Sequence, residues 1–173
     1  EGKFISEYRT IARNNGQQRW IRAVGKVYFD KDNQPERFVG AVSDISQAKT
    51  AELQAREFAE RKSRLAAIVD SSDDVIISKD LNGVIATWNP SAQRMFGFTP
   101  EEAIGKHISL VIPEERLNEE DLIISRIRKG EKVDHFDTVR QAKDGSPRQL
   151  SITDSPIMEA EGNVIGATKI ARD

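Results

Sequence analysis

The sequence contains no cysteine, which excludes disulfide bonds, thiolate nucleophiles and cysteine-ligated metal sites. Its two histidines, His107 and His135, lie in different predicted elements and have no acidic or imidazole partner at metal-ligand spacing, so we interpret both as surface residues. The acidic residues show no pairing typical of a glycosidase, and no nucleophile–base pair is visible. We therefore expect a non-catalytic chain without a metal site.

Long apolar runs are also missing. None approaches the roughly 18 residues that a membrane-spanning helix needs, and no signal peptide is visible, so we expect a cytoplasmic protein without direct membrane contact. The net charge is only −2, with basic and acidic residues interspersed, which gives no reason to expect a nucleic-acid partner. Because the chain opens in mid-pattern at Glu1-Gly2 without an initiator methionine, we expect a fragment of a longer protein.

The most informative stretch is residues 81–105, in which turn residues, caps and aromatic side chains follow one another closely. Asn82-Gly83 tolerates positive φ and predicts a two-residue turn. The turn would join a strand at 75–79 to a strand at 84–88.

Two short helices are predicted directly after this hairpin. Asn89 is a favourable N-cap for a helix that begins at Pro90 and ends at Gly97. Thr99 and Glu102 then have the spacing of a capping box, which predicts a second helical turn.

A longer helix is predicted at residues 114–128, before Gly130. Leu117, Ile124 and Ile127 share one face at spacings of seven and three residues. The other face carries the charged residues Glu119, Glu120, Arg126 and Arg128.

Strand patterns occur in two separate passages, at 4–12, 19–29 and 37–42, and again at 136–142, 148–158 and 164–171. Turns are predicted at Asn14-Asn15-Gly16 and at Asp144-Gly145. The passages align at a constant offset, which pairs Gly16 with Gly145, Arg19 with Arg148, Ile21 with Leu150, Ala23 with Ile152 and Asp44 with Asp173. This favours an internal repeat, against the alternative that any two three-strand meanders look alike.

Residues 46–69 contain neither glycine nor proline and predict an uninterrupted helix. One heptad frame places small or apolar residues and one charge at its a and d positions: Ala48, Ala51, Ala55, Phe58, Lys62, Leu65 and Val69. Such a narrow seam is typical of a marginal two-stranded coiled coil. The alternative is an exposed spacer helix that packs on a neighbouring domain.

The segment Thr87-Trp-Asn-Pro-Ser-Ala-Gln-Arg-Met-Phe-Gly-Phe-Thr-Pro-Glu-Glu-Ala-Ile-Gly105 closely resembles the strand-to-helix motif of the PAS domain family. The resemblance implies an α+β fold, in which a five-stranded antiparallel sheet has helices over one face. It implies a complete PAS domain at 70–173, a linker helix at 46–69, and at 1–45 a partial remnant, the last three strands of a preceding PAS domain.

A sheet covered in this way leaves a small apolar cavity, where the resemblance implies that a PAS domain holds its ligand. We expect the walls to be Ile76, Ser78, Met95, Phe98, Ile124, Ile127 and Ile152. The alternative is that these residues form a filled core.

The resemblance also limits the cofactors. PAS domains that hold haem supply a histidine from the long helix, and residues 112–126 contain none. Light-driven flavin adducts and thioester-linked chromophores need a cysteine, so we expect neither haem nor a cysteinyl flavin. A non-covalent flavin or a small metabolite stays open, and the ligand is unknown. We interpret Trp88 as a core or rim residue, against stacking on a flavin.

By resemblance, we expect a sensory and dimerisation module of a bacterial-type signal-transduction protein, upstream of a histidine kinase core and homodimeric through residues 46–69. The alternatives are a ligand-free interaction scaffold and the PAS segment of a cyclic-di-nucleotide enzyme or a transcription regulator. Residues 1–45 leave Trp20, Tyr28 and Phe38 uncovered, so we expect them to pair with a second chain or pack on the complete domain.

Overall fold

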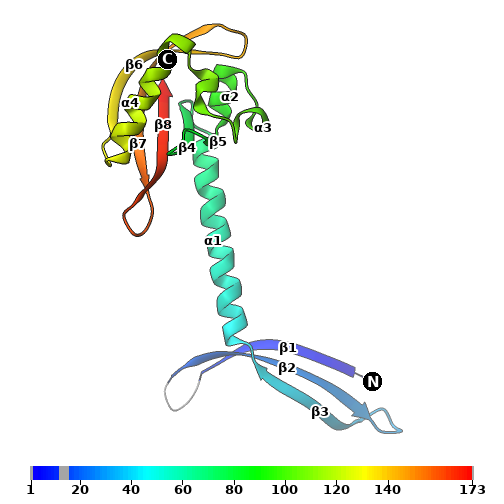
Figure 1. The fold of residues 1–173 in the computed structure, drawn as a ribbon. Helices are drawn as coiled ribbons and strands as arrows, with labels where there is room; N and C mark the ends of the chain where they lie inside the picture. The colour runs from blue at the N-terminus through cyan, green and yellow to red at the C-terminus, as the bar shows by residue number, and fades with distance from the viewer. Residues whose placement is uncertain (1, 12–15, 173) are drawn as a thin grey trace. The chain divides into compact units, whose positions relative to one another are not determined.

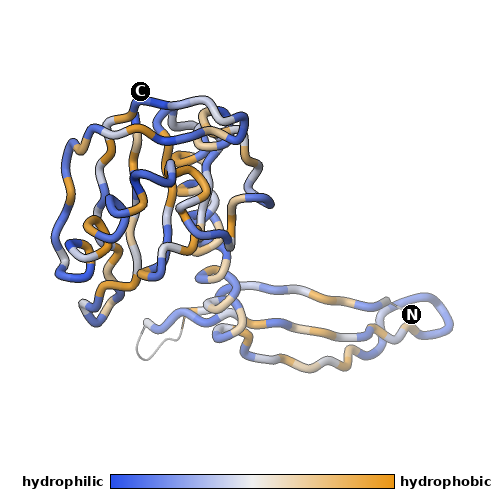
Figure 2. Tube along the Cα trace, turned by 45° about the horizontal axis from the view of Figure 1, so that its top comes forward, coloured by the Kyte–Doolittle hydropathy of each residue, from blue (hydrophilic) through white to orange (hydrophobic). Residues whose placement is uncertain are grey.

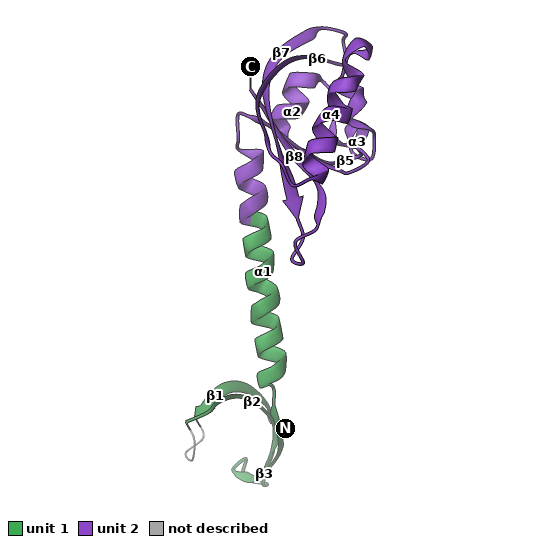
Figure 3. Ribbon diagram, turned by 60° about the vertical axis from the view of Figure 1, so that its left-hand side comes forward, with its two compact units in different colours: residues 1–63 green, residues 64–173 purple. Residues whose placement is uncertain are grey.

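The computed structural model describes residues 2–11 and 16–172. It divides into two compact units, residues 1–63 and residues 64–173 (Figure 3), and the boundary falls within helix α1 (Ser46–Asp70). The predicted turn at Asn14-Asn15-Gly16 lies largely outside the described residues, as does Asp173 at the end of the predicted repeat. Within the described part of the chain, no helix is long and apolar enough to cross a membrane. The predicted division into three domains stays a prediction.

The first unit contains an antiparallel sheet with the order β1-β2-β3 and the start of α1 (Figure 1). Its strands are β1 (Gly2–Ile11), β2 (Gln18–Phe29) and β3 (Pro35–Asp44). Ser46 attaches α1 to this sheet, because its Oγ accepts a hydrogen bond from the Trp20 amide at 2.8 Å while its own amide donates to Asp44 at 2.9 Å. Lys49 adds an ion pair to Glu7 at 3.0 Å.

Apolar side chains are exposed on both faces of the first sheet. Apolar and polar residues are mixed along its strands (Figure 2). Phe38 is 58% exposed, and Trp20 and Tyr28 are half-buried. Pairing of residues 1–45 with a second chain or with the other unit stays a prediction.

The second unit is an α+β fold with a five-stranded antiparallel sheet in the order β5-β4-β8-β7-β6. The strands are β4 (Val75–Asp80), β5 (Ile85–Trp88), β6 (Val133–Gln141), β7 (Pro147–Met158) and β8 (Val164–Arg172). The helices are α2 (Pro90–Phe96), α3 (Pro100–Ala103), η1 (Ile108–Val111), η2 (Glu114–Arg116) and α4 (Leu117–Arg128). The sheet curves around α2 and α4 (Figure 3), with α2 against β4 and α4 against β6, β7 and β8. The predicted fold class is confirmed.

The predicted caps of the short helices are confirmed. Asn89 Oδ1 accepts a hydrogen bond from the Ala92 amide at 2.9 Å, and Gly97 ends α2 with φ of 78°. The Glu102 carboxylate accepts from the Thr99 amide at 3.0 Å. Trp88 is 6% exposed and packs in the core, where its ring lies 5.7 Å from that of Phe96.

The last two strands of each three-strand passage correspond closely. At the offset that places Gly16 on Gly145, the bounds of β2 coincide with those of β7. The strand register also shifts at equivalent places, between Tyr28 and Phe29 and between Ile157 and Met158. Both the strand bounds and the irregularity therefore support an internal repeat.

Helix α4 turns a partly charged face towards the sheet. Its buried residues are Glu120, Ile123, Ile124 and Ile127. Leu117, at the start of α4, shares the face of Ile124 and Ile127 but is 41% exposed. The prediction that Glu120 lies on the opposite face from Ile124 and Ile127 is wrong, because Glu120 is buried and lies one helical turn from Ile123 and Ile124.

Glu119 joins α4 to β6 through hydrogen bonds and ion pairs. Its carboxylate accepts hydrogen bonds from Arg140 at 2.8 Å, Thr138 at 2.6 Å and Arg116 at 2.7 Å. Burial alone would raise the pKa of Glu119, but these hydrogen bonds together outweigh it and hold the pKa below its ordinary value of 4.5. The ionised form of Glu119 therefore stabilises the attachment of α4.

We predict that Ile127→Ala lowers the free energy of unfolding by about 2–5 kcal/mol, because it removes buried methyl groups and leaves a cavity between α4 and the sheet. Ile127 is fully buried, whereas Leu122, on the same helix, is 65% exposed. Leu122→Ala is therefore the matched control and should change stability little. Urea denaturation followed by circular dichroism measures both, and equal losses would contradict this packing.

We predict that Glu119→Gln destabilises the fold by about 1–3 kcal/mol at pH 7, the range for a charged hydrogen bond. Because the folded-state pKa is lowered, the ionised Glu119 contributes its full stabilisation above the ordinary value of 4.5, and this is lost as the pH falls through the lowered pKa. The difference between variant and wild type should therefore shrink in acid. Glu115→Gln, at an exposed site, is the control; a pH-independent difference would refute the assignment.

Candidate functional site

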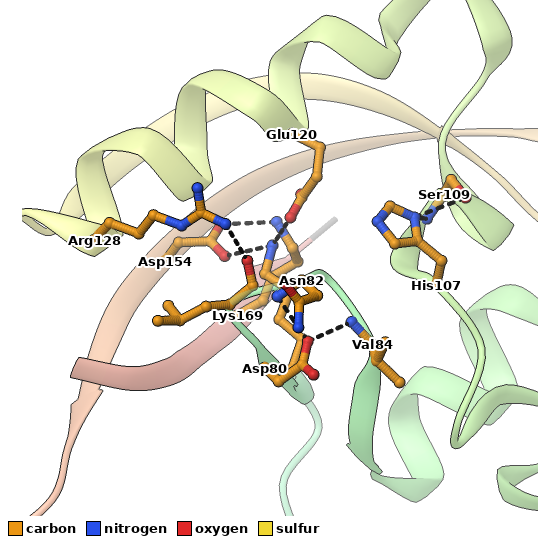
Figure 4. Close-up of polar contacts among 11 residues, drawn as sticks. Asp80, Asn82, Val84, His107, Ser109, Glu120, Arg128, Asp154 and Lys169 are labelled. Atoms are coloured by element: carbon orange, nitrogen blue, oxygen red, sulfur yellow. Dashed lines mark hydrogen bonds and ion pairs between the residues drawn. The ribbon is translucent and has the colours of Figure 1, made fainter.

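Two lysines and two carboxylates are buried between α4 and the sheet (Figure 4): Lys79 of β4, Glu120 of α4, Asp154 of β7 and Lys169 of β8, none more than 4% exposed. Lys79 pairs with Glu120, and its Nζ lies 3.5 Å from Asp154 Oδ1. Lys169 lies directly opposite Asp154 across the strands and donates to its Oδ2 at 2.7 Å. These four residues, here called the ion cluster, thus link α4 to three strands.

In the ion cluster two lysines balance two carboxylates, but two carboxylate oxygens have no hydrogen-bond donor among the described residues. Burial lowers the pKa of Lys169, and the charge of Asp154 opposes this only in part. Within the described part of the chain, Glu120 Oε2 and Asp154 Oδ1 have no hydrogen-bond partner. Buried carboxylate oxygens in proteins nearly always have a donor, so the unpartnered Glu120 Oε2 is suited to a ligand that supplies one.

A pocket of ≈ 520 Å³ opens beside the ion cluster. Its walls are the turn between β4 and β5, His107 just before η1, and the part of α4 from Glu120 to Arg128 with the following Lys129. Most wall residues are polar or charged, with Leu81 and Ile124 as the apolar exceptions. The pocket is therefore suited to a small polar molecule.

The turn between β4 and β5 is wider than the predicted two residues. The Asp80 amide donates to the Val84 carbonyl at 2.9 Å, which leaves residues 81–83 as the loop. Asp80 Oδ1 stabilises this form by accepting from the amides of Asn82 at 2.8 Å and Val84 at 2.9 Å. Gly83 adopts φ of +79°, and a Cβ there would lie 2.4 Å from His107 Nε2. Glycine is thus needed both for the backbone and for the histidine that packs on it.

His107 and Arg128 bring donors to the pocket from opposite sides (Figure 4). His107 Nδ1 accepts from the Ser109 amide at 3.1 Å, so the neutral ring carries its proton on Nε2, the nitrogen next to Gly83. Arg128 donates to the Leu81 carbonyl at 2.9 Å, which joins the end of α4 to the turn.

The structure separates the seven residues predicted to line one cavity. Ile152 lies opposite Ala171, which lies opposite Val75, so these three share the face under the helices. Ile76 and Ser78 alternate with the buried residues of β4 and therefore point to the other face. Their predicted place beneath the helices is thus corrected.

The other five predicted residues lie on the helix side of the sheet. Ile127 and Ile152 belong to the buried core, and Met95 and Phe98 pack against it at its margin. Only Ile124 also lines the pocket beside the ion cluster. The residues beneath the helices thus form a core, and the pocket lies at its edge.

The ion cluster itself was missed from the sequence. Lys79 and Asp154 lie two positions from the buried Ile77 and Ile152 and therefore share their inner face. Their charge argued for solvent, because lysine and aspartate are rarely buried unless paired. The one signal in the sequence that could have located Lys79 and Asp154 was their alternation in step with the buried residues of their strands.

Haem held from the long helix does not fit these residues. Helix α4 carries no histidine, and Glu120, the buried carboxylate among the α4 residues that line the pocket, is engaged by Lys79. His135 lies on β6 and does not line this pocket. Among the described residues, no three histidine or acidic side chains are grouped to hold a metal ion.

Comparison with known proteins gives relatives for both units. The chain is 31% identical over 127 residues to the sensor protein FixL of Bradyrhizobium diazoefficiens, which covers 73% of this chain and 24% of FixL. It is 26% identical over 179 residues to the probable diguanylate cyclase DgcE of Escherichia coli, covering 98% of this chain and 15% of DgcE. The chain thus spans less than a quarter of the length of each of these two relatives.

The crystal structure of a PAS domain from Colwellia psychrerythraea matches with a TM-score of 0.58 and 26% identity, over 64% of this chain and 94% of that one. A family described as PAS fold matches residues 63–173, and a second family of the same description matches residues 1–42. The first match alone covers more than half of the sequence, with the sheet order and helices described above. The chain therefore belongs to the PAS fold family.

Proposed function

We propose that this chain is a sensory and dimerisation segment of a signal-transduction protein, which passes packing changes at the pocket to helix α1. The observation that carries the proposal is the course of β4. This strand begins just after α1, at Val75, and ends at Asp80, whose side chain organises the pocket turn. One short strand therefore connects the end of α1 to the candidate ligand site.

Asn89 secures the α1 end of this connection. Its Nδ2 donates to the carbonyls of Val69 at 3.3 Å and Asp74 at 2.9 Å, while its Oδ1 accepts from the Ile76 amide at 3.0 Å and also caps α2. Asn89 is 2% exposed, so water does not compete for these bonds. A displacement of β4 therefore acts directly on the last turn of α1.

The pocket end of β4 is tied to α4. Lys79, next to the pocket turn, pairs with Glu120, and Arg128 holds the Leu81 carbonyl. A ligand or a partner that moves α4 would pull on both contacts. Coupling between sites is typically worth about 1–3 kcal/mol, which is comparable to what a weak helical seam resists.

The relatives support a place within a larger signalling protein. One is a sensor protein and another a probable diguanylate cyclase. We infer that the segment has no turnover of its own and acts in the cytoplasm. In our proposal it lies upstream of a histidine kinase core, with a cyclic-di-nucleotide enzyme as the alternative output.

Dimerisation is proposed through the a and d positions of α1. Phe58 is 72% exposed and Leu65 60% exposed, and none of the residues of α1 is buried within one chain. Apolar side chains repeating along a helix favour a second copy of that helix. A narrow seam with Lys62 inside it would let small inputs change its register.

We predict that Asn89→Asp keeps the cap of α2 but loosens the end of α1, because a carboxylate cannot donate to the Val69 and Asp74 carbonyls. The expected loss of stability is about 1–3 kcal/mol. Hydrogen exchange should accelerate at the amides of Ser71 and Ser72, which bond to the last turn of α1. Asn118→Asp, at an exposed position, is the matched control, and unchanged exchange at Ser71 would count against the relay through Asn89.

We predict that Phe58→Cys forms a disulfide-linked dimer on mild oxidation, because a d position faces its copy across the seam. The native chain has no cysteine, so the introduced thiol is the sole reactant. Glu57→Cys, one residue away and outside the seam, is the control. Non-reducing electrophoresis measures the yield, and equal crosslinking of the two variants would argue against the seam.

A further inference from the structure

We propose that the pocket beside the ion cluster binds a small zwitterion, whose ammonium group donates to Glu120 and whose carboxylate lies at Arg128 and His107. This site rests on the proposed sensory function and adds the chemical class of the stimulus. It is carried by the geometry of one buried acceptor and several donors that share a single pocket.

The buried end of the pocket calls for a donor. Glu120 is 4% exposed and lines the pocket, and its Oε2 has no hydrogen-bond partner within the described part of the chain. Its other oxygen is held by Lys79, which fixes the direction of the carboxylate. A protonated amine is the strongest partner for a buried carboxylate oxygen.

The opposite end of the pocket supplies donors instead. The guanidinium of Arg128 donates a hydrogen bond from Nη2 to the Leu81 carbonyl. Its other N–H groups can donate to a carboxylate. His107 faces the same pocket with Nε2 protonated, because its Nδ1 accepts from Ser109. Lys129 adds a second positive charge at the rim. An anionic group is therefore favoured here.

The distance between the two ends limits the ligand. Glu120 and Arg128 are separated by about 12 Å along the helix axis at 1.5 Å per residue. The arginine side chain leans towards the helix N-terminus, which shortens the gap between the two charged groups. The ligand should thus carry its ammonium and carboxylate several methylene groups apart, as ω-amino acids do.

The charge balance of the ion cluster supports an ammonium group over a metal cation. Lys79 and Lys169 already neutralise the charges of Glu120 and Asp154. A divalent ion would face two buried positive charges, whereas a single ammonium adds one charge that Asp121 at the rim offsets. The ligand's own carboxylate then balances Arg128.

The test is isothermal titration of the 173-residue chain with γ-aminobutyrate and ε-aminocaproate. Butyrate lacks the ammonium group, n-butylamine lacks the carboxylate, and inorganic phosphate tests for a simple anion site. We expect at least one zwitterion to bind about tenfold more tightly than each of these three, the loss expected for one charge-assisted hydrogen bond.

Two variants locate the site. Arg128→Gln should raise the dissociation constant about tenfold, while Arg126→Gln, on the same helix but outside the pocket, should leave it unchanged. Glu120→Gln should abolish the preference for zwitterions over butyrate. Circular dichroism checks that Glu120→Gln is folded. If that variant is unfolded, the dissociation constant of Arg128→Gln decides whether the zwitterion binds in this pocket.

Three results would overturn the zwitterion site: no binding of either ω-amino acid at millimolar concentration, equal binding of n-butylamine, or tighter binding of phosphate. Crosslinking of Phe58→Cys with and without ligand distinguishes failure of the zwitterion site from failure of the proposed sensory relay. Zwitterion binding that leaves crosslinking unchanged supports the site and removes the relay. Absent binding with an intact dimer removes the site and retains the dimerisation module.

Discussion

The burial of four charges between α4 and the sheet is the constraint on which this fold depends most. Removing ions from water is costly, and pairing offsets the cost only when the geometry is good. The ion cluster pairs in this way only when α4 occupies one position, because its residues come from four different elements: Lys79, Glu120, Asp154 and Lys169. Apolar contacts alone would tolerate small rotations of the helix, but a displaced Glu120 would leave Lys79 with only a distant partner. The ion cluster therefore specifies where α4 lies more sharply than the isoleucines do.

The ion cluster connects the pocket to β4, because Glu120 of the pocket wall pairs with Lys79 of that strand. Lys79 is part of the strand that leads from α1, and the pocket turn begins directly after Asp80. Glu120 belongs both to the ion cluster and to the pocket wall. A molecule that engages its free oxygen changes the electrostatic environment of Lys79 without touching it. Interfaces of this kind respond in discrete steps, because packed cores repack rather than deform continuously.

Much of the fold could be predicted from local signals. Asn89, Gly97 and Glu102 act within a few residues of themselves, so their roles as caps follow from sequence order alone. The repeated meander was equally visible, because turn residues recur at a constant offset.

The candidate site was predictable only in part, because it depends on partners far apart in the chain. Glu120 meets a lysine 41 residues earlier in the sequence, and no local pattern shows that such a pairing exists. A charged residue is ordinarily assigned to a different helix face from the apolar ones, which is why Glu120 was predicted to lie opposite Ile124 and Ile127. For β4, alternation fixed two sets of residues but not their faces: Ile76 and Ser78 form one set, Val75, Ile77 and Lys79 the other. The set with the lysine proved to be the inner one, since its charge is paired.

The repeat offers an internal comparison of what the helices do. Leu150 and Ile152 of β7 are 4% and 1% exposed, whereas the equivalent Ile21 and Ala23 of β2 are half-buried. The register between the last two strands is the same in both passages, so backbone hydrogen bonding accounts for the pairing of these strands but not for their burial. Helix α4 packs against all three strands of the second passage. The meander is thus a platform that the chain uses twice, and the helix held over it by Glu119 and Glu120 is what turns that platform into a core with a pocket at its edge.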